Sequence, residues 1–144
     1  MEPLRLSREI HQAMLAHCLA ESPLECCGVL GGKERLATSI FRFRNILASE
    51  NRYEADPTDI IRAVQELRSR GEEFVAIYHS HPQWQAVPSR TDLDRNGYGE
   101  LPQIIVGLKT ELPEIRAWRY EVNSFEEIRL ILEGPVVDAA NEPR

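Results

Sequence analysis

This 144-residue chain lacks most features of a membrane, secreted or nucleic-acid-binding protein. No apolar run approaches the roughly 20 residues that span a bilayer as a helix. Residues 1–5 lack the charged and then apolar pattern of a secretory signal. Basic residues number 17 against 23 acidic ones, and the net charge of -6 disfavours nucleic acid as the main partner. We therefore expect a cytoplasmic protein whose partners are neither membranes nor nucleic acids.

Cysteine is also scarce, which argues against a disulfide-stabilised fold. The three cysteines are Cys18, Cys26 and Cys27, and no C-x-x-C pair occurs. In a strand, the adjacent Cys26 and Cys27 would point to opposite faces. We expect all three thiols to be reduced, unreactive and mostly buried.

Two common zinc-enzyme motifs are absent as well. The chain has no H-E-x-x-H, the metal-binding helix of many metalloproteases. It also has no H-x-E…P-C-x-x-C, the motif of zinc nucleobase deaminases. A zinc enzyme of either kind is therefore excluded.

The order of apolar patterns predicts one α/β domain. Helices are expected from Ser7 to about Glu21, from Pro57 to Gly71, and from Ser89 to near Gly97 or Gly99. Strands are expected at 27–32, 37–44, 74–78, 104–108, 116–120 and 127–132. These elements predict a mixed, mostly antiparallel sheet flanked by helices over residues 1–133, followed by a flexible tail at 134–144.

The most informative residues are H-S-H-P at 79–82 and S-R-T-D at 89–92. His79 and His81 are two residues apart at the end of a predicted strand, so both rings face the same side. Asp92 lies one turn into the next predicted helix and can fold back toward them. Two imidazoles and one carboxylate leave a fourth tetrahedral position open, as in a catalytic zinc site.

A purely structural interpretation of part of this pattern stays open. Ser89 and Asp92 also form a capping-box pattern at a helix start, and a lone H-x-H occurs by chance. Pro82 and Pro88, which restrict the loop between the two halves, make the combination favour a metal site. Both roles can coexist if Ser89 starts the helix while its hydroxyl faces the site.

A hydrolytic zinc site also needs a general base. Glu25 is the favoured candidate because it enters a buried apolar strand, where a free carboxylate is costly. Glu50, Glu54 and Glu100 remain alternatives.

The pattern H-S-H-P…P-S-x-x-D, with an upstream E-x-C-G-x-L-x-G, resembles the JAMM motif of JAB/MPN-type zinc metallopeptidases. The resemblance extends from the first helix to the strand at 117–120, and the short length is similar to that of small prokaryotic members. It implies a JAB/MPN-like fold and one Zn²⁺ per chain with a bound water. It also implies His79, His81 and Asp92 as zinc ligands, Glu25 as general base and acid, and Ser89 as oxyanion donor.

Two classes of function follow from the resemblance. The first is a metallopeptidase or isopeptidase that hydrolyses the amide bond after the C-terminal Gly-Gly tail of a ubiquitin-like or sulfur-carrier protein, either releasing cysteine or another amino acid or removing a tag from lysine. The alternative is a non-catalytic MPN-type scaffold that binds protein partners, although such relatives typically lack the ligands present here. A homodimer stays open. Trp84 either lines the substrate channel or packs on the domain, and residues 51–56 could pair with an extended substrate tail.

Overall fold

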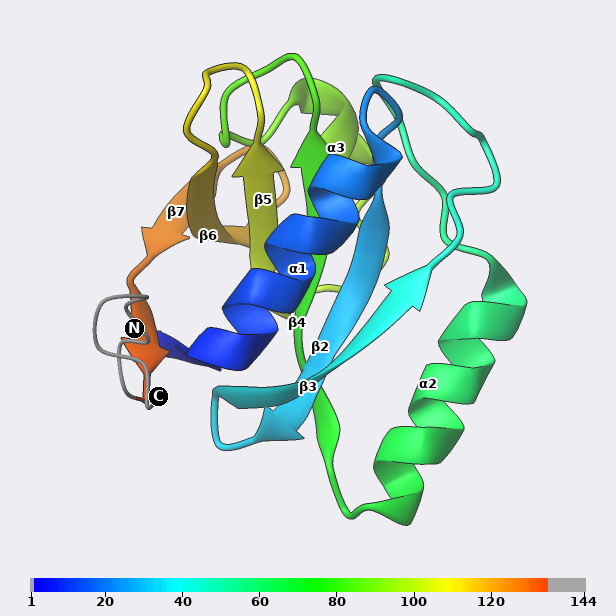
Figure 1. Ribbon diagram of the computed structural model, residues 1–144, viewed down its shortest axis with the longest axis vertical. Helices are drawn as coiled ribbons and strands as arrows, with labels where there is room; N and C mark the ends of the chain where they lie inside the picture. The colour runs from blue at the N-terminus through cyan, green and yellow to red at the C-terminus, as the bar shows by residue number, and fades with distance from the viewer. Residues whose placement is uncertain (1, 135–144) are drawn as a thin grey trace, which may run out of the picture.

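The computed structural model describes residues 2–134, which form one eight-stranded sheet with helices on both faces (Figure 1). The helices are α1 (Arg8–Glu21), α2 (Pro57–Ser69) and α3 (Arg90–Asp94). The strands are β1 (Leu4–Ser7), β2 (Cys27–Lys33), β3 (Leu36–Phe43), β4 (Glu73–His81), β5 (Gln103–Gly107), β6 (Glu114–Tyr120), β7 (Phe125–Ile128) and β8 (Leu130–Glu133). No helix among the described residues is long and apolar enough to cross a bilayer.

The strand order is β7-β6-β5-β4-β2-β3-β1-β8. Four of the neighbouring pairs are antiparallel and three are parallel, so the predicted mixed, mostly antiparallel sheet is confirmed. β7 and β8 lie at opposite edges of the sheet, yet only Arg129 separates them in the chain. The sheet must therefore curl until its two edges meet at this residue.

The two faces of the sheet carry separate hydrophobic cores, because successive strand side chains point to opposite sides. On one face, Met14 of α1 packs in a cluster with Leu30. On the other, Ala63 of α2 packs in a cluster with Val29. The three cysteines are buried and free, and Cys26 and Cys27 lie in different clusters, as the sequence predicted.

β4 lies between β5 and β2 and is buried from Val75 to His81. Such a strand, covered on both faces, holds its side chains in fixed positions. Ile77 belongs to the core on the α2 side. Because His79 and His81 follow at intervals of two residues, they point to the α2 side as well, whereas Ser80 points to the α1 side.

The predicted third helix was wrong in its C-terminal boundary. α3 ends at Asp94 instead of near Gly97 or Gly99. The side chain of Asn96 accepts a hydrogen bond from the Tyr98 amide and donates one to the Gly99 carbonyl, at 3.0 and 3.1 Å. These local bonds give the backbone an alternative to helix, so the turn replaces a second helical turn.

The prediction of the C-terminal strand was also wrong in part. The single strand predicted at 127–132 is two strands, β7 and β8, because one pairs with β6 and the other with β1. β1 was not predicted, and both of its partners are distant in the sequence. Beyond Gly134, the predicted 134–144 tail lies outside the described residues.

Candidate metal centre and catalytic cleft

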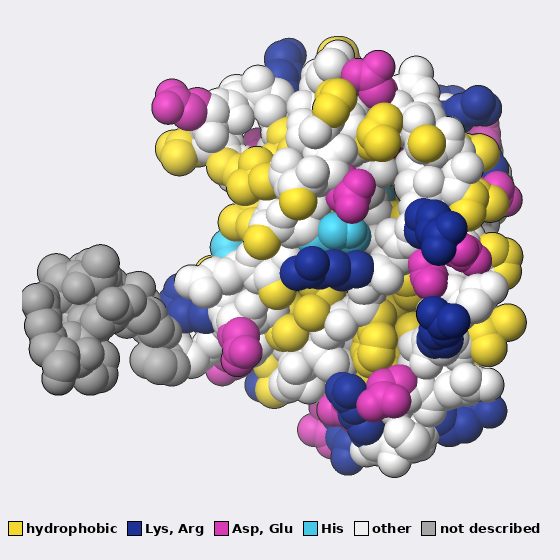
Figure 2. Space-filling view, turned by 45° about the vertical axis from the view of Figure 1, so that its right-hand side comes forward, with side chains coloured by type: hydrophobic (Ala, Val, Ile, Leu, Met, Phe, Trp, Pro, Cys, Tyr) yellow, Lys and Arg dark blue, Asp and Glu magenta, His cyan; other side chains and the backbone are white. Residues whose placement is uncertain are grey.

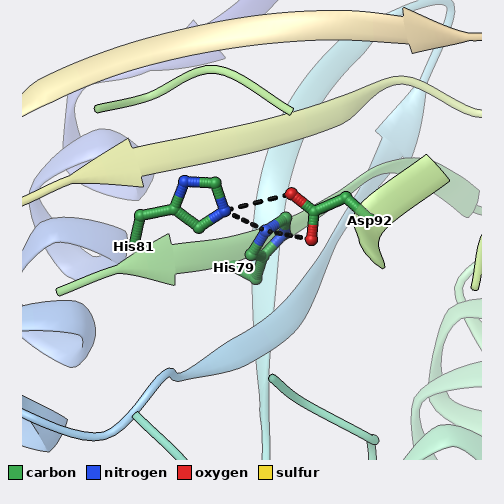
Figure 3. A group of neighbouring side chains, drawn as sticks. All are labelled: His79, His81 and Asp92. Atoms are coloured by element: carbon green, nitrogen blue, oxygen red, sulfur yellow. Dashed lines mark hydrogen bonds and ion pairs between the residues drawn. The ribbon is translucent and has the colours of Figure 1, made fainter. Parts of the chain in front are cut away.

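The side chains of His79, His81 and Asp92 converge where β4 ends and α3 begins (Figure 3). The Nε2 atoms of the two histidines lie 3.1 Å apart. The Asp92 oxygens lie 3.2 Å from His79 Nε2 and 3.0 Å from His81 Nε2. One ligand atom from each residue lies within 4.8 Å of the other two. The fold thus brings together the three residues predicted as metal ligands.

The second ring nitrogen of His81 explains how this side chain is oriented. Its Nδ1 lies 2.8 Å from the backbone carbonyl oxygen of Gln85. A carbonyl only accepts, so Nδ1 carries the proton and donates, which leaves the Nε2 lone pair directed at the cluster.

Tyr53 holds the other histidine, a contact that sequence reasoning missed. Its ring stacks on the fully buried His79 ring with centroids 4.7 Å apart and planes 28° apart. His79 Nδ1 has no hydrogen-bond partner among residues 2–134. The stacking, and not a second-nitrogen hydrogen bond, therefore restrains the His79 ring. The sequence placed Tyr53 in a candidate substrate-binding segment but held no signal for this contact.

A capping box aims Asp92 at the histidines. Ser89 Oγ accepts a hydrogen bond from the Asp92 amide at 3.0 Å, and Asp92 Oδ2 accepts one from the Ser89 amide at 2.9 Å. The same Oδ2 atom faces His81. The capping bonds therefore hold the carboxylate at the cluster. The Ser89 hydroxyl uses its oxygen as acceptor here, so its proton is free for another partner.

The donor set fits a divalent metal ion. Imidazole nitrogen and carboxylate oxygen are both zinc ligands. Burial alone would raise the pKa of Asp92, but His79 and His81 beside it hold that pKa far below its usual range. Two Nε2 atoms and a carboxylate pointing at one another need a cation or a proton between them. A divalent metal ion would meet this need with three protein ligands and leave one coordination position open.

Glu25 is a buried carboxyl beside this cluster. The side chain is 5% exposed, and its backbone is fixed by Ser49 and Asn45, which bond its N–H and C=O at 2.8 and 3.0 Å. Burial raises the pKa of Glu25 to about 7, against the opposing effect of the nearby histidines. A carboxyl with a pKa near neutrality can both accept and donate a proton. The alternative bases Glu50, Glu54 and Glu100 are all exposed.

Two clefts border the metal-ligand cluster. The first, the Glu25 cleft, has a volume of about 600 Å³ and is lined by Glu25, Glu50, His81, Pro82, Trp84 and Ser89 among others. The second, the Tyr53 cleft, has a volume of about 420 Å³ and is lined by Arg52, Tyr53, Thr91, Asp92, Arg95 and Tyr98 among others. In the view of Figure 2, hydrophobic, acidic and basic side chains are interspersed over the surface, and histidine shows only in small patches.

The loop between the ligand motifs is fixed by contacts that the sequence did not reveal. The Ala86 amide donates to Glu114 at 3.0 Å, and the Ala86 carbonyl accepts from the Trp118 indole at 2.9 Å. Gly107 makes this close approach possible, because a Cβ at that position would lie 2.7 Å from the Ala86 nitrogen. The only sequence signal was Gly107, a glycine within the strand predicted at 104–108.

Trp84 and the 51–56 segment both border the site. The Trp84 side chain is 58% exposed at the Glu25 cleft, with Lys109 Nζ 5.2 Å from its ring centroid. Within the segment, Ala55 forms a β-bridge with Asn45. Part of the segment's backbone therefore already pairs with the chain itself. Contact of Trp84 and of residues 51–56 with a substrate stays a prediction.

The chain belongs to the family of prokaryotic homologs of the JAB domain, whose model matches residues 7–121. A solved structure of protein DSY2949 from Desulfitobacterium hafniense superimposes with a TM-score of 0.85 and 26% identity, over 92% of this chain and 94% of that one. The predicted JAB/MPN-like fold is therefore confirmed.

Three curated relatives show the kinds of protein to which the chain is similar. A desampylase from Pyrococcus furiosus is 33% identical and covers 80% of this chain and 81% of its own length. A probable TtuB-protein conjugate cleaving protease from Thermus thermophilus is 32% identical, over 72% of this chain and 70% of its own length. A CysO-cysteine peptidase from Mycobacterium tuberculosis is 34% identical, over 62% of this chain and 63% of its own length. The relatives named here carry the names of hydrolytic enzymes.

Proposed function

We propose that the chain is a zinc-dependent metallopeptidase that hydrolyses the amide bond after the C-terminal Gly-Gly tail of a ubiquitin-like or sulfur-carrier protein. The observation that carries the proposal is the shared cleft, which is lined by Glu25, Ser89 and the candidate ligand His81. The names of the relatives, which include a conjugate-cleaving protease and a CysO-cysteine peptidase, support the same reaction class.

In the proposed reaction, His79, His81 and Asp92 would hold one Zn²⁺. Bound there, the metal would polarise the substrate carbonyl and lower the pKa of a water to about 7. Glu25 accepts the proton of the attacking water and transfers it to the departing amine. In the metal-free protein, burial raises the pKa of Glu25 to about 7, which makes this carboxyl a better proton acceptor than an exposed glutamate.

Ser89 supplies the remaining polar contact. Its hydroxyl donates to the oxygen of the tetrahedral carbon, where negative charge develops. Removal of one such donor typically costs about 100-fold to 1000-fold in rate. The capping bond leaves the hydroxyl proton free for this role because Ser89 Oγ only accepts in it.

The position of Glu25 also orients the substrate. Glu25 protonates the leaving amine, so the amine side lies in the Glu25 cleft, beside Trp84. The acyl side of the substrate then extends past Asp92 into the Tyr53 cleft, between the 51–56 segment and α3. Glycines suit this end of the substrate because they approach the metal without side-chain clashes.

A two-substrate assay tests the proposal. Zinc-loaded protein is incubated with a carrier whose Gly-Gly tail is joined to cysteine, and separately with the same tail joined to a lysine side chain. We expect hydrolysis of at least one substrate, loss of activity on chelation and recovery with zinc. The Glu25→Gln variant should retain zinc and lose turnover. Binding of the carrier without cleavage of either substrate would instead favour the scaffold alternative.

A further inference from the structure

A pair of neighbouring thiols, Cys18 and Cys26, lies where the end of α1 meets the start of β2. The Sγ atoms of Cys18 and Cys26 are only 3.1 Å apart, and both residues are at most 1% exposed. Both thiols are free, and the proposed hydrolytic mechanism uses neither. A disulfide bond is about 2.05 Å long. Its formation here would require the two sulfurs to approach by about 1 Å.

The surroundings make Cys26 the more reactive thiol of the pair. The hydrogen bond with Cys18, aided by the nearby His17, lowers the pKa of Cys26 in spite of its burial. Since the thiolate is the nucleophilic form, Cys26 would react first. Cys18 lies near the end of α1, and residues 19–23 that follow it are all exposed. Helix ends open locally more readily than the centre of a sheet, which gives a small oxidant access.

We propose that Cys18 and Cys26 form an oxidation site, at which a peroxide converts the two thiols into a disulfide that slows hydrolysis. The Cys26 sulfur attacks one peroxide oxygen, the O–O bond breaks, and a sulfenic acid and one water form. The Cys18 sulfur then attacks the sulfenic sulfur, the S–O bond breaks, and the hydroxyl leaves with the Cys18 proton as a second water. Two thiols are thereby oxidised and hydrogen peroxide is reduced to two waters.

The disulfide would act on the candidate site through the backbone around Cys26. Glu25, the proposed proton carrier, is the adjacent residue. Ser80 Oγ accepts from the Cys26 amide at 2.9 Å, and the Ser80 amide donates to the Cys26 carbonyl at 3.0 Å. In the sequence of β4, Ser80 lies between the candidate ligands His79 and His81. Any part of the sulfur approach that moves the Cys26 backbone therefore reaches both Glu25 and β4, and a misplacement of about 1 Å at a reacting group can lower a rate about 100-fold.

Peptide mapping tests the cross-link without any assay of activity. Reduced full-length protein is treated with hydrogen peroxide, remaining thiols are alkylated, and peptides are analysed by mass spectrometry. We expect a Cys18–Cys26 peptide with the loss of two hydrogens. Cys27 is the matched control: it is equally buried, but it faces the opposite core and burial raises its pKa. Cys27→Ser should still form the cross-link, whereas Cys18→Ser and Cys18→Ala should not.

The inhibitory effect rests on the proposed function and is tested by a second measurement, the rate of carrier cleavage. Reduced wild-type and Cys18→Ala proteins should cleave the carrier substrate equally. Peroxide should slow only the wild type, and a dithiol reductant should restore it. No cross-link in folded protein, under conditions that cross-link the urea-unfolded chain, would overturn the oxidation site. A cross-link without a change in rate would overturn the inhibition. An inactive reduced protein would count against the proposed function, while the peptide map would still decide the oxidation site.

Discussion

Replacing Ser89 separates its two roles, which the sequence could not distinguish. As the N-cap of α3, Ser89 accepts a hydrogen bond through its Oγ from the Asp92 amide at 3.0 Å. As oxyanion donor, it would contribute only in the transition state. Alanine removes both contributions and should lower stability by about 1 kcal/mol. Glycine at an N-cap costs only a few tenths of a kcal/mol but also lacks the hydroxyl.

We therefore expect Ser89→Ala and Ser89→Gly to lose the same activity, about 100-fold to 1000-fold in kcat, although their stabilities differ. Ser89→Thr keeps a hydroxyl that can both cap and donate, so it should retain most activity. The measurements are denaturant unfolding, zinc content and kcat on the carrier substrate. The zinc content shows whether Asp92 still reaches the metal. If Ser89→Gly keeps near-normal kcat while Ser89→Ala does not, activity follows the cap and the oxyanion role is refuted.

Four further predictions concern the metal and its surroundings. Tyr53→Ala should weaken zinc affinity about tenfold in a chelator competition while Tyr53→Phe preserves it, because the stacking on His79 needs only the ring; equal loss in both variants would contradict this. Gly107→Ala should displace the loop at Ala86 and slow turnover with zinc still bound, measured by kcat beside metal content. Chelation should lower the melting temperature by several degrees, and Asp92→Asn should remove most of that difference, because only the folded state binds zinc tightly. In metal-free protein, the folded-state pKa of Glu25 is about 7, above the unfolded value of 4.5, so the ionised carboxyl destabilises the fold as pH rises between these values. Glu25→Gln should therefore match the wild type in unfolding free energy at pH 4 and exceed it by up to about 3 kcal/mol at pH 8.

The candidate ligands could be predicted because their geometry is local. His79 and His81 need only strand periodicity to share a face, and Asp92 needs only a helix start at Ser89. Glu25 could be favoured because it directly precedes an apolar strand. The roles of these residues remain proposals, but their assembly at one cluster and one cleft is what the structure shows.

The supporting contacts could not be predicted, because each depends on segments distant in the sequence. Tyr53 reaches His79 from the loop before α2, and Glu114 holds Ala86 from β6. The same reason explains the missed strand β1, which is four residues long and pairs with strands near residues 36 and 131. Short strands carry little pattern of their own, and their existence is decided by the partner.

α3 shows why the site and the local fold depend on the same bonds. A five-residue helix has too few internal hydrogen bonds to be stable alone. Its start is held by the reciprocal bonds between Ser89 and Asp92, and the Asp92 carboxylate also faces His79 and His81. A metal at this cluster would tie the carboxylate to β4 and thereby fix the helix start against the sheet. Metal binding and ordering of α3 should consequently be coupled, with the Ser89 hydroxyl brought into its proposed position by the same event.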